Sequence, residues 1–397
     1  MKRLLLLVAV AAYAPSGSTD GSRAVPPPLL VNPTLVGMHV SLVATVDSMI
    51  NAAIAEGVAP GAAVAIGRRG RLVMLKGYGR LDNRPGFAEV TESSIYDLAS
   101  LSKVVGLTTA TMMLVDDRKL ELDAPLSRYL PELRDYPDKQ SITVRNVLAH
   151  DAGFRAFAPL YGSYRGRAQY LKAIAELPLE YPTGTRTVYS DFGPILLGLA
   201  IESVTGERLD QFLRKRLFEP LGMGDTYYNP PPSLFARVAP TEVDTSFRRT
   251  HVHGTVHDEN AFALGGVAGH AGLFSSARDL ARFAQLLVNR GEYAGRRYIA
   301  AETITQFTRR QSDRSSRALG WDTPSPNSSA GDHFAPNSYG HTGFTGTSIW
   351  IDPERSLFVI LLTNRVNPTR ENQKHVPLRV ALANAVQQAV LDRSLSR

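Results

Sequence analysis

The chain has 397 residues, of which 44% are hydrophobic, so it can bury a substantial core. It contains no cysteine, which excludes disulfide bonds, thiol catalysis and cysteine-ligated zinc. The formal net charge is +7, but the arginines are scattered and form no dense tract interleaved with aromatic residues. We therefore expect no nucleic-acid partner.

Residues near the N-terminus have the pattern of a secretory signal peptide. Lys2 and Arg3 supply positive charge, Leu4–Ala12 is a short apolar run, and small residues follow. The run is too short for a stable membrane span, although an uncleaved membrane anchor is the alternative. We predict a signal peptide over about residues 1–24, with cleavage between Ala14 and the end of that range. This predicts an exported protein, either periplasmic or secreted.

The remaining chain is predicted to form one folded module. It contains no internal repeat, heptad run or Gly/Ser-rich linker, so we expect an extended proline-rich tether over residues 25–37 and a single module over residues 38–395. An α/β part is expected over about residues 38–100 and 262–395. A mostly helical part is expected over about residues 101–261, where apolar periodic segments alternate with proline-containing loops.

Helical and strand-like patterns follow each other along this module. Apolar residues at helical spacing predict helices over residues 39–56, 97–115, 143–149, 192–204, 278–289 and 378–391. β-rich runs predict strands over residues 62–67, 72–79, 347–352 and 357–363. Because strands occur near both ends of the module, we predict an α+β fold: one antiparallel sheet flanked by helices, with an inserted, mostly helical subdomain.

The first candidate for chemistry is Ser100, at the start of a helix that is apolar on nearly every face. Lys103 follows three residues later, and positions i and i+3 lie on one helix face, so a hydroxyl and an amine are expected side by side. Of the eight lysines, only this one follows a serine at that spacing. The dipole and free N–H groups of a helix start favour negative charge. The arrangement indicates a serine nucleophile that forms an acyl-enzyme.

Two further motifs supply a candidate base and a candidate binding edge. Tyr189 and Asp191 precede a predicted helix; a phenol with a pKa of about 10 is a poor base, but a nearby lysine cation favours the phenolate. The alternative is a core tyrosine followed by a capping aspartate. The segment His341-Thr342-Gly343 precedes a predicted strand. Its glycine would allow close approach of a substrate, and an ordinary loop entering a strand is the alternative.

In this order and spacing, the three motifs resemble the serine β-lactamase-related superfamily. The branch includes class C β-lactamases, D-Ala-D-Ala carboxypeptidases and family VIII esterases. The resemblance covers essentially residues 38–393. It extends to five shorter signatures, at Pro60-Gly61, Asp97-Leu98-Ala99-Ser100, Leu148 to Gly153, Pro220-Leu221-Gly222-Met223 and Gly272 to Ser276.

The resemblance implies a role for each motif residue. Ser100 corresponds to the acylated nucleophile, Lys103 to its partner and Tyr189 to the general base, while Asp191 lies on the rim of the site. The segment His341-Thr342-Gly343 corresponds to the substrate-facing strand. The oxyanion hole would consist of the backbone N–H groups of the nucleophile and of Phe344.

Two positions depart from the β-lactamases that the chain resembles. Asp191 stands where those enzymes have asparagine, and His341 stands where they have lysine. We expect a pocket with less fixed positive charge to turn over β-lactams slowly. A His341 that is protonated below about pH 6.5 would restore a cation and improve binding of carboxylate-bearing substrates.

These features together predict an exported active-serine hydrolase. The resemblance favours a penicillin-binding, D-Ala-D-Ala carboxypeptidase-like enzyme acting on peptidoglycan peptides. A carboxylesterase or lactonase, a weak class C-type β-lactamase and a non-catalytic binding protein are the alternatives. The expected partner is a small molecule or peptide (a peptidoglycan stem peptide, a β-lactam or an ester), with no cofactor and no stable membrane span.

Several histidines lie outside the three motifs. His251, His253, His257 and Asp258 carry side chains that can ligate zinc, but their spacing matches no strong metal signature. We interpret them as part of a polar loop near the mouth of the site and expect no metal. His150, in the Leu148 to Gly153 signature, is interpreted as structural.

Overall fold

The computed structural model describes residues 27–326 and 328–392. The predicted signal peptide over residues 1–24 and the first two residues of the predicted tether lie outside the described residues, so the structure does not bear on that part of the prediction. No helix among the described residues is both long enough and apolar enough to cross a bilayer.

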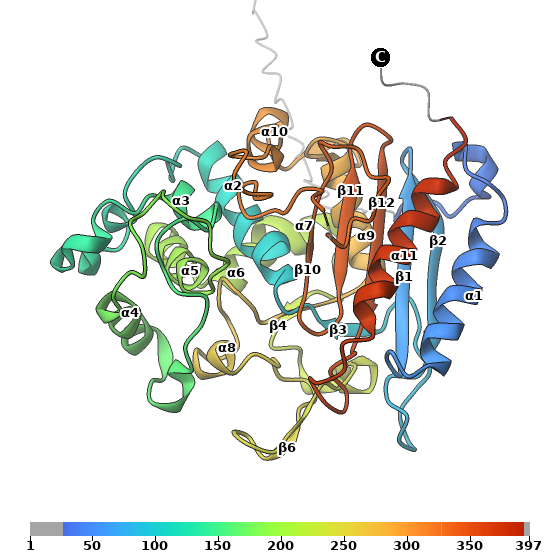
Figure 1. Cartoon of the computed structure of the whole chain (residues 1–397), viewed down its shortest axis with the longest axis horizontal. Helices are drawn as coiled ribbons and strands as arrows, with labels where there is room; N and C mark the ends of the chain where they lie inside the picture. The colour runs from blue at the N-terminus through green and yellow to red at the C-terminus, as the bar shows by residue number, and fades with distance from the viewer. Residues whose placement is uncertain (1–26, 327, 393–397) are drawn as a thin grey trace, which may run out of the picture.

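A five-stranded antiparallel sheet forms one side of the molecule (Figure 1). Its strands, in spatial order, are β10 Tyr339–Thr342, β11 Ser348–Asp352, β12 Leu357–Thr363, β1 Gly61–Arg68 and β2 Arg71–Gly79. Strand β1 pairs with β12 from the far end of the chain, with Ala62 opposite Thr363. The prediction of one antiparallel sheet built from distant segments is confirmed.

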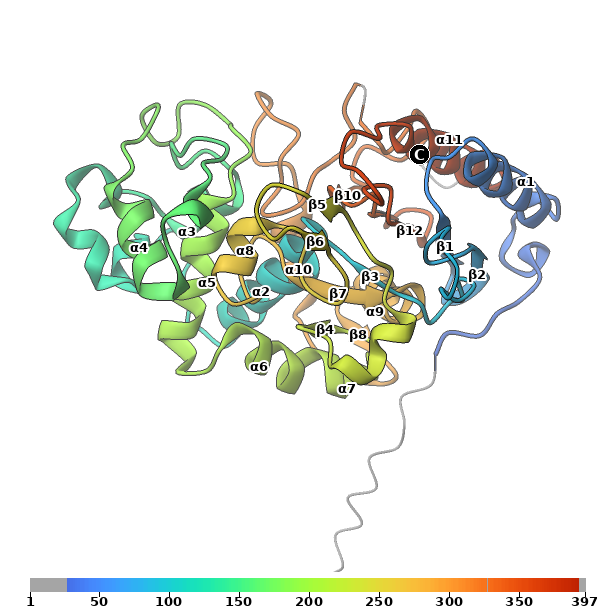
Figure 2. The ribbon, with the colours of Figure 1, turned by 90° about the horizontal axis from the view of Figure 1, so that it is seen from below.

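Helices cover both faces of this sheet (Figure 2). The first helix, α1 Leu42–Ala55, and the last, α11 His375–Gln388, pack together on one face, where Val64 and Ile66 of β1 point. Helix α9 Ala277–Val288 covers the other face, where Ala63 and Ala65 point. Because both faces are covered, every residue of β1 is buried, as the continuous apolar run of that strand requires.

The C-terminal helix begins earlier than predicted. We expected it over residues 378–391, but α11 begins at His375 and ends at Gln388. Pro377 lies in its first turn, where a missing N–H costs no helical hydrogen bond, so proline does not delay the start of the helix.

The helical part of the chain lies beside the sheet, on the left in Figure 1. At its centre is a buried helix that has π-helical geometry over η2 Lys103–Thr108 and continues as α2 Thr109–Asp116. The other helices are α3 Val144–Leu148, α4 Gly166–Glu176, α5 Phe192–Thr205, α6 Leu209–Leu213, π-helical η7 Arg214–Phe218, α7 Glu219–Leu221, α8 Glu259–Ala263 and α10 Ala301–Thr308. The short 3-10 helices are η1 Pro33–Val36, η3 Leu126–Arg128, η4 Pro131–Asp135, η5 Pro137–Lys139, η6 Leu160–Gly162 and η8 Pro232–Arg237.

Short strands connect the two parts. A three-stranded sheet has the order β3 Ile95–Asp97, β7 Leu273–Ser276, β4 Tyr227–Tyr228. Two small hairpins pair β5 Val243–Asp244 with β6 Thr250–His251 and β8 Glu292–Tyr293 with β9 Arg296–Arg297. We predicted a helix from residue 97, but Asp97 ends β3 and the helix begins only after Ser100, because pairing with β7 holds this segment extended.

Part of the segment that we expected to be an extended tether is packed against the module. Residues 33–36 form the 3-10 helix η1, with Val36 buried. The N–H of Val31 donates to the carbonyl oxygen of Leu72 in β2. Proline at the first position of a short helix is favourable, and these buried contacts hold the segment in place.

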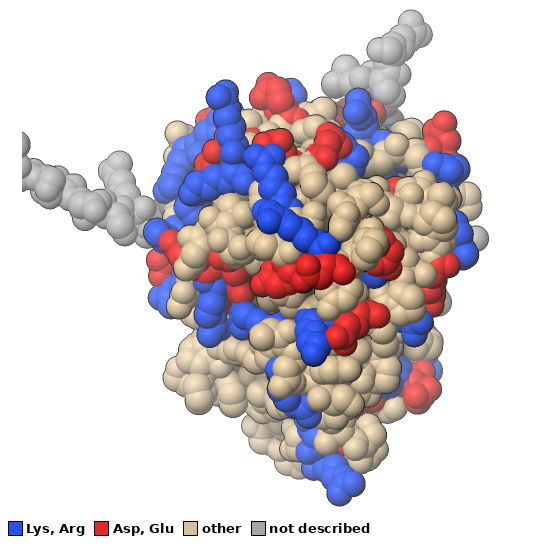
Figure 3. All heavy atoms as spheres, turned by 90° about the vertical axis from the view of Figure 1, so that its left-hand side faces the viewer, with Lys and Arg blue, Asp and Glu red and all other residues tan. Residues whose placement is uncertain are grey.

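Charges of both signs cover the face formed by the helical part. Lys and Arg gather in the upper region of this face, and Asp and Glu form a band below them (Figure 3).

Candidate active site

Ser100 lies in a tight turn between β3 and the central helix. The buried Asp97 carboxylate accepts a hydrogen bond from the N–H of Ala99 (2.8 Å), and Ala99 has a left-handed backbone, with φ of 47°. This turn leads directly into the helix, where Lys103 Nζ donates a hydrogen bond to Ser100 Oγ (3.0 Å). The predicted pairing of hydroxyl and amine across one helical turn is confirmed.

Lys103 is buried and paired with a carboxylate. Its ammonium contacts Asp191 Oδ1 (2.7 Å) and donates to the carbonyl oxygen of His270 (3.0 Å). Burial alone would lower the pKa of Lys103, but Asp191 and Tyr189 outweigh burial and raise this pKa above its ordinary value. Lys103 is therefore a cation at neutral pH. Asp191, which the resemblance assigns to the rim, forms an ion pair with it.

The ring of Tyr189 lies between two cations. Lys103 Nζ is 4.9 Å from the ring centroid, and so is the guanidinium carbon of Arg317. The rings of His150 and His341 lie 4.6 Å and 5.8 Å from it. The buried Tyr189 hydroxyl is close enough to raise the pKa of Lys103. It makes no well-formed hydrogen bond to a described residue. The Tyr189 ring thus lies beside the Lys103 ammonium, where the resemblance places the candidate base.

The edge strand β10 is held against the turn that carries Ser100. Thr345 Oγ1 donates to the carbonyl oxygen of Asp97 (2.7 Å), and Thr347 Oγ1 donates to that of Leu98 (3.0 Å). A Cβ atom at Gly343 would lie 2.3 Å from the Leu98 carbonyl oxygen and 2.1 Å from Thr347 Oγ1, so only glycine fits there. The β-rich pattern alone predicted a strand only at residues 347–352, but the resemblance also implied a strand at His341-Thr342-Gly343, and His341 and Thr342 indeed belong to β10.

Two backbone N–H groups next to the Ser100 hydroxyl are free. Neither the N–H of Ser100 nor that of Phe344 donates a hydrogen bond to another described residue. The Phe344 ring is stacked on His257, with centroids 5.7 Å apart, and the Arg365 guanidinium lies 4.4 Å from its centre. These two contacts leave the Phe344 ring about half exposed, and backbone donors beside a candidate nucleophile are the groups that stabilise an oxyanion.

His341 does not supply the cation that we expected. Its Nδ1 is 2.8 Å from the carbonyl oxygen of Thr342, and Arg317 Nη1 donates to its Nε2 (3.4 Å). This pattern assigns the neutral tautomer that carries a proton on Nδ1. Burial, Arg317 and Lys103 hold the pKa of His341 well below its ordinary value. The expectation that His341 becomes cationic below pH 6.5 is wrong, because burial and the permanent cation of Arg317 both oppose its protonation.

The cleft consists of two hollows that share Ser100, Tyr189 and Phe344. The hollow on the β10 side has a volume of about 420 Å³, and its charged lining is mostly basic: Arg317, Arg365, Arg379 and Asp322. The other has a volume of about 230 Å³, and its charged lining is mostly acidic: Asp191, Asp258, Glu259 and Arg370. The candidate nucleophile therefore lies between a positive and a negative compartment.

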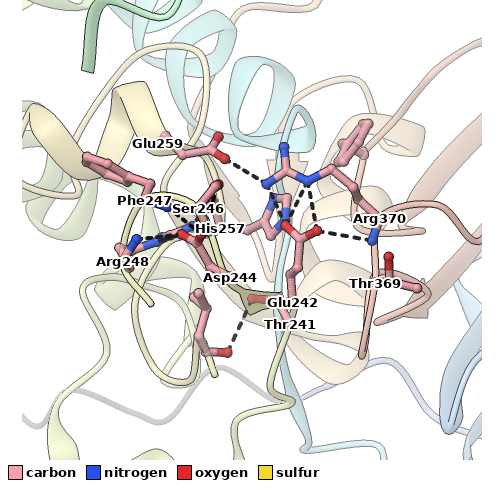
Figure 4. Close-up of polar contacts among 12 residues, drawn as sticks. Thr241, Glu242, Asp244, Ser246, Phe247, Arg248, His257, Glu259, Thr369 and Arg370 are labelled. Carbon is pink, nitrogen blue, oxygen red and sulfur yellow. Dashed lines mark hydrogen bonds and ion pairs between the residues drawn. The ribbon is translucent and has the colours of Figure 1, made fainter. Parts of the chain in front are cut away.

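An ion-pair network lies at the smaller hollow, which His257, Glu259 and Arg370 help to line, and Figure 4 shows its contacts. Arg370 Nη2 contacts both Glu242 Oε2 (2.5 Å) and Glu259 Oε1 (2.6 Å), and His257 Nε2 lies 3.0 Å from Glu242 Oε2. Burial would raise the pKa of Glu242, but hydrogen bonds from His257 and Arg370 lower this pKa to about 2. The network joins the loop before α8 to the segment after β12.

The histidines that we considered as metal ligands have separate partners. His257 pairs with Glu242, and Asp258 pairs with His270 (2.9 Å). His253 Nε2 lies within hydrogen-bond distance of two backbone carbonyl oxygens. Within residues 27–326 and 328–392, no three His, Cys, Asp or Glu side chains gather as a metal site.

The arginines of the cleft were not among the predicted site residues. Arg317, Arg370 and Arg379 lie far from the three motifs along the chain, and only the fold brings them to Ser100. No short pattern distinguishes them from the other arginines of an arginine-rich chain.

Comparison with known proteins identifies the family. The sequence matches the beta-lactamase family over residues 46–384. The chain belongs to this family. A Bacillus subtilis relative named "N-acetylmuramyl-L-alanine amidase" is 34% identical and aligns with 88% of this chain and 85% of its own length. An Escherichia coli K12 relative named "Putative D-alanyl-D-alanine carboxypeptidase" is 32% identical and aligns with 94% of each chain. This member of the beta-lactamase family is a serine hydrolase.

Solved structures show the same fold. A penicillin-binding protein homologue from Caulobacter crescentus has a TM-score of 0.71 at 22% identity, covering 88% of this chain and 99% of its own. The hydrolase EstCE1 has a TM-score of 0.70 at 23% identity, covering 87% of this chain and 98% of its own. These neighbours confirm the β-lactamase-like architecture of this family member.

Proposed function

We propose that this chain is an exported serine hydrolase that forms an acyl-enzyme on Ser100 and releases the C-terminal residue of peptidoglycan-like peptides. The observation that carries the proposal is the 3.0 Å hydrogen bond from Lys103 Nζ to Ser100 Oγ. It places an ammonium against the candidate nucleophile, beside the free N–H groups of Ser100 and Phe344.

Tyr189 is the proposed general base. Asp191 keeps Lys103 protonated, so this lysine acts as a cation and does not accept the proton of Ser100. The Tyr189 phenolate, held between Lys103 and Arg317, takes this proton as Ser100 Oγ attacks the substrate carbonyl. The phenol then returns the proton to the leaving amine, and a water molecule attacks the acyl-enzyme by the reverse sequence.

A terminal carboxylate on the substrate fits the basic hollow. Arg317 lines this hollow with His341, Thr342 and Ser100, and an arginine guanidinium binds carboxylates by paired hydrogen bonds. A carboxypeptidase substrate carries a carboxylate next to the bond that is cleaved. This match, together with the name of the Escherichia coli relative, favours a D-Ala-D-Ala carboxypeptidase-like activity.

A second candidate is an amidase that acts on the N-acetylmuramyl-L-alanine bond. The name of the Bacillus subtilis relative supports it. Both bonds are amides with an alanine as the leaving group, so the same serine can serve either. The configuration of this alanine and the bulk of the acyl group differ between the two substrates.

Intact-protein mass spectrometry tests the proposal. The protein is exposed in parallel to an acyl-D-Ala-D-Ala peptide, an N-acetylmuramyl-L-alanyl peptide, a penicillin and a short-chain ester, with Ser100→Ala as the control. We expect an acyl adduct that maps to Ser100 and release of D-alanine from the first substrate. Release of only the L-alanyl peptide from the second substrate would favour the amidase, and release of only alcohol from the ester would favour an esterase. An adduct on another residue would overturn the proposal.

A further inference from the structure

A third hollow, of about 440 Å³, adjoins the basic side of the cleft. Three segments line it: the α3 region at residues 145–151, the loop at residues 184–187 and the loop at residues 311–317. Arg317 also lines the 420 Å³ hollow at Ser100. A ligand that extends from Ser100 past Arg317 therefore enters this third hollow, which we call the arginine hollow.

The lining of the arginine hollow is strongly basic. It contains Arg145, Arg186, Arg314 and Arg317, against a single carboxyl group, that of Asp151. Burial raises the pKa of Asp151 above its ordinary value, and even a fully ionised Asp151 leaves four guanidinium groups facing one carboxylate. The hollow therefore has an excess of positive charge that the protein itself does not neutralise.

Most of these arginines lack a carboxylate partner. Arg145 forms an ion pair with Asp123 (2.7 Å), but among the described residues no acidic side chain forms an ion pair with Arg186, Arg314 or Arg317. The guanidinium of Arg186 lies over the ring of Tyr181, 5.3 Å from its centroid. A stacked guanidinium keeps its edge N–H groups available for an anion.

We propose that the arginine hollow binds a second carboxylate, carried by the leaving group of the substrate, through Arg186 and Arg314. This inference rests on the proposed function, in which Arg317 holds the first carboxylate of the leaving residue. The substrate class is a peptide whose C-terminal residue is a dicarboxylic amino acid. Each carboxylate of such a residue would meet the forked N–H donors of an arginine. A C-terminal dicarboxylic residue should therefore bind more tightly than a neutral residue of the same shape.

The test compares three peptides with the same acyl part that end in D-Ala-D-Ala, D-Ala-D-Glu and D-Ala-D-Gln. The last two have the same shape and differ in one charge. Binding to Ser100→Ala is measured by calorimetry, so the result does not depend on turnover. At low ionic strength we expect the D-Glu peptide to bind about 10-fold more tightly than the D-Gln peptide, and added salt should reduce this ratio.

Variants locate the second carboxylate. In the Ser100→Ala background, Arg186→Gln with Arg314→Gln should bring the ratio of the two affinities close to one and leave D-Gln binding unchanged. The matched control, Arg296→Gln in the exposed strand β9, should keep the wild-type ratio. Equal binding of the two peptides by Ser100→Ala, or a ratio that survives the double substitution, would overturn this inference. Failure of the proposed function would show separately, as the absence of an acyl adduct on Ser100.

Discussion

The ion pair between Lys103 and Asp191 controls how the charge beside Ser100 responds to pH. Asp191 is a main cause of the raised pKa of Lys103, and burial opposes it. In Asp191→Asn only burial and Tyr189 remain as large influences, so the pKa of Lys103 should fall. Because the proposed mechanism needs the ammonium form, kcat/KM should be lost as pH rises through this pKa. We expect the alkaline limb of the pH–rate profile to move toward neutral pH by one unit or more.

Asp210→Asn is the matched control for this prediction. Asp210 forms an ion pair with Arg208 in the helical part, and its substitution should leave the alkaline limb in place. An unchanged limb in Asp191→Asn would show that Lys103 does not need its proton for turnover.

Arg317, rather than His341, is expected to recognise a substrate carboxylate. Loss of a hydrogen bond to a charged group costs about 1.5–3 kcal/mol, so Arg317→Gln should raise KM for a carboxylate-terminated peptide by about 10- to 100-fold. The corresponding peptide amide, which lacks the charge, serves as the control and should be much less affected. Since the pKa of His341 is held well below its ordinary value, KM of the wild type should stay flat between pH 7.5 and 5.5. A KM that decreases as pH falls through 6.5 would instead support binding of the carboxylate by a protonated His341.

For individual residues, the sequence predicts contacts between side chains that are close together along the chain and misses contacts between distant ones. Ser100 and Lys103 are one helical turn apart, so helix geometry alone brings their side chains together. The contact of Lys103 with Asp191, and that of Arg317 with His341, join segments that are far apart in the chain. Those contacts give Asp191 a cationic partner and oppose protonation of His341, and no spacing rule contains them.

Among the elements, helix α9 carries a carboxyl group in an unusual environment. Asp279, in its first turn, accepts hydrogen bonds from the N–H of Asp225 (2.6 Å) and from Thr226 Oγ1 (2.9 Å). Burial raises the pKa of Asp279 to about 6. The folded state therefore holds this proton more tightly than the unfolded state does. The resulting stabilisation is fully present below about pH 4 and is lost as pH rises through about 6.

Asp279→Asn should remove this pH dependence. The difference in unfolding free energy between wild type and variant should change by up to about 3 kcal/mol between pH 4 and pH 7, on the scale of 1.36 kcal/mol per pKa unit. Denaturant unfolding at several pH values measures it. The exposed Asp313→Asn should run parallel to the wild type. A constant difference between wild type and Asp279→Asn across this range would contradict the raised pKa.

Long apolar elements were predicted well, and short strands were not. The strands β1, β2, β11 and β12 have five to nine residues with strong β-rich patterns. Strand β10 has only four residues, Tyr339–Thr342, and it is a strand because β11 pairs with it. Strands β3 and β7 likewise depend on each other across the chain, so their own sequences do not specify them.

For the whole molecule, we predict export. Sequencing the N-terminus of the protein isolated from its native cells tests this prediction. The charged Lys2-Arg3 pair and the apolar run Leu4–Ala12 should direct secretion, with processing between Ala14 and Ala24. The protein isolated from the cell envelope or medium should begin after one of these positions. Retention of Met1 in a cytoplasmic fraction would contradict the prediction.

The structure sets a limit on where such processing can occur. The buried Arg68 side chain donates through Nη1 to the carbonyl oxygens of Val36 and Gly37 (both 2.7 Å), and its Nη2 contacts Asp392 Oδ1 (2.7 Å). The N–H of Leu391 donates to the carbonyl oxygen of Gly37 (3.0 Å). Arg68 thus links Val36 and Gly37, near the start of the described chain, to Asp392 at its end.

A chain that begins at Val25 keeps all these contacts. A chain that begins at His39 loses the buried Val36 and Met38 side chains, and it leaves the Arg68 Nη1 group without its two carbonyl acceptors. Burial of such side chains contributes about 1.5–3 kcal/mol each, and the loss of two hydrogen bonds from a buried guanidinium that keeps its ion pair with Asp392 adds a further cost. We expect the shorter chain to unfold at a temperature at least about 5 °C lower in calorimetry. Equal unfolding temperatures would show that residues 25–38 are dispensable, and cleavage beyond Ala24 would then be compatible with the fold.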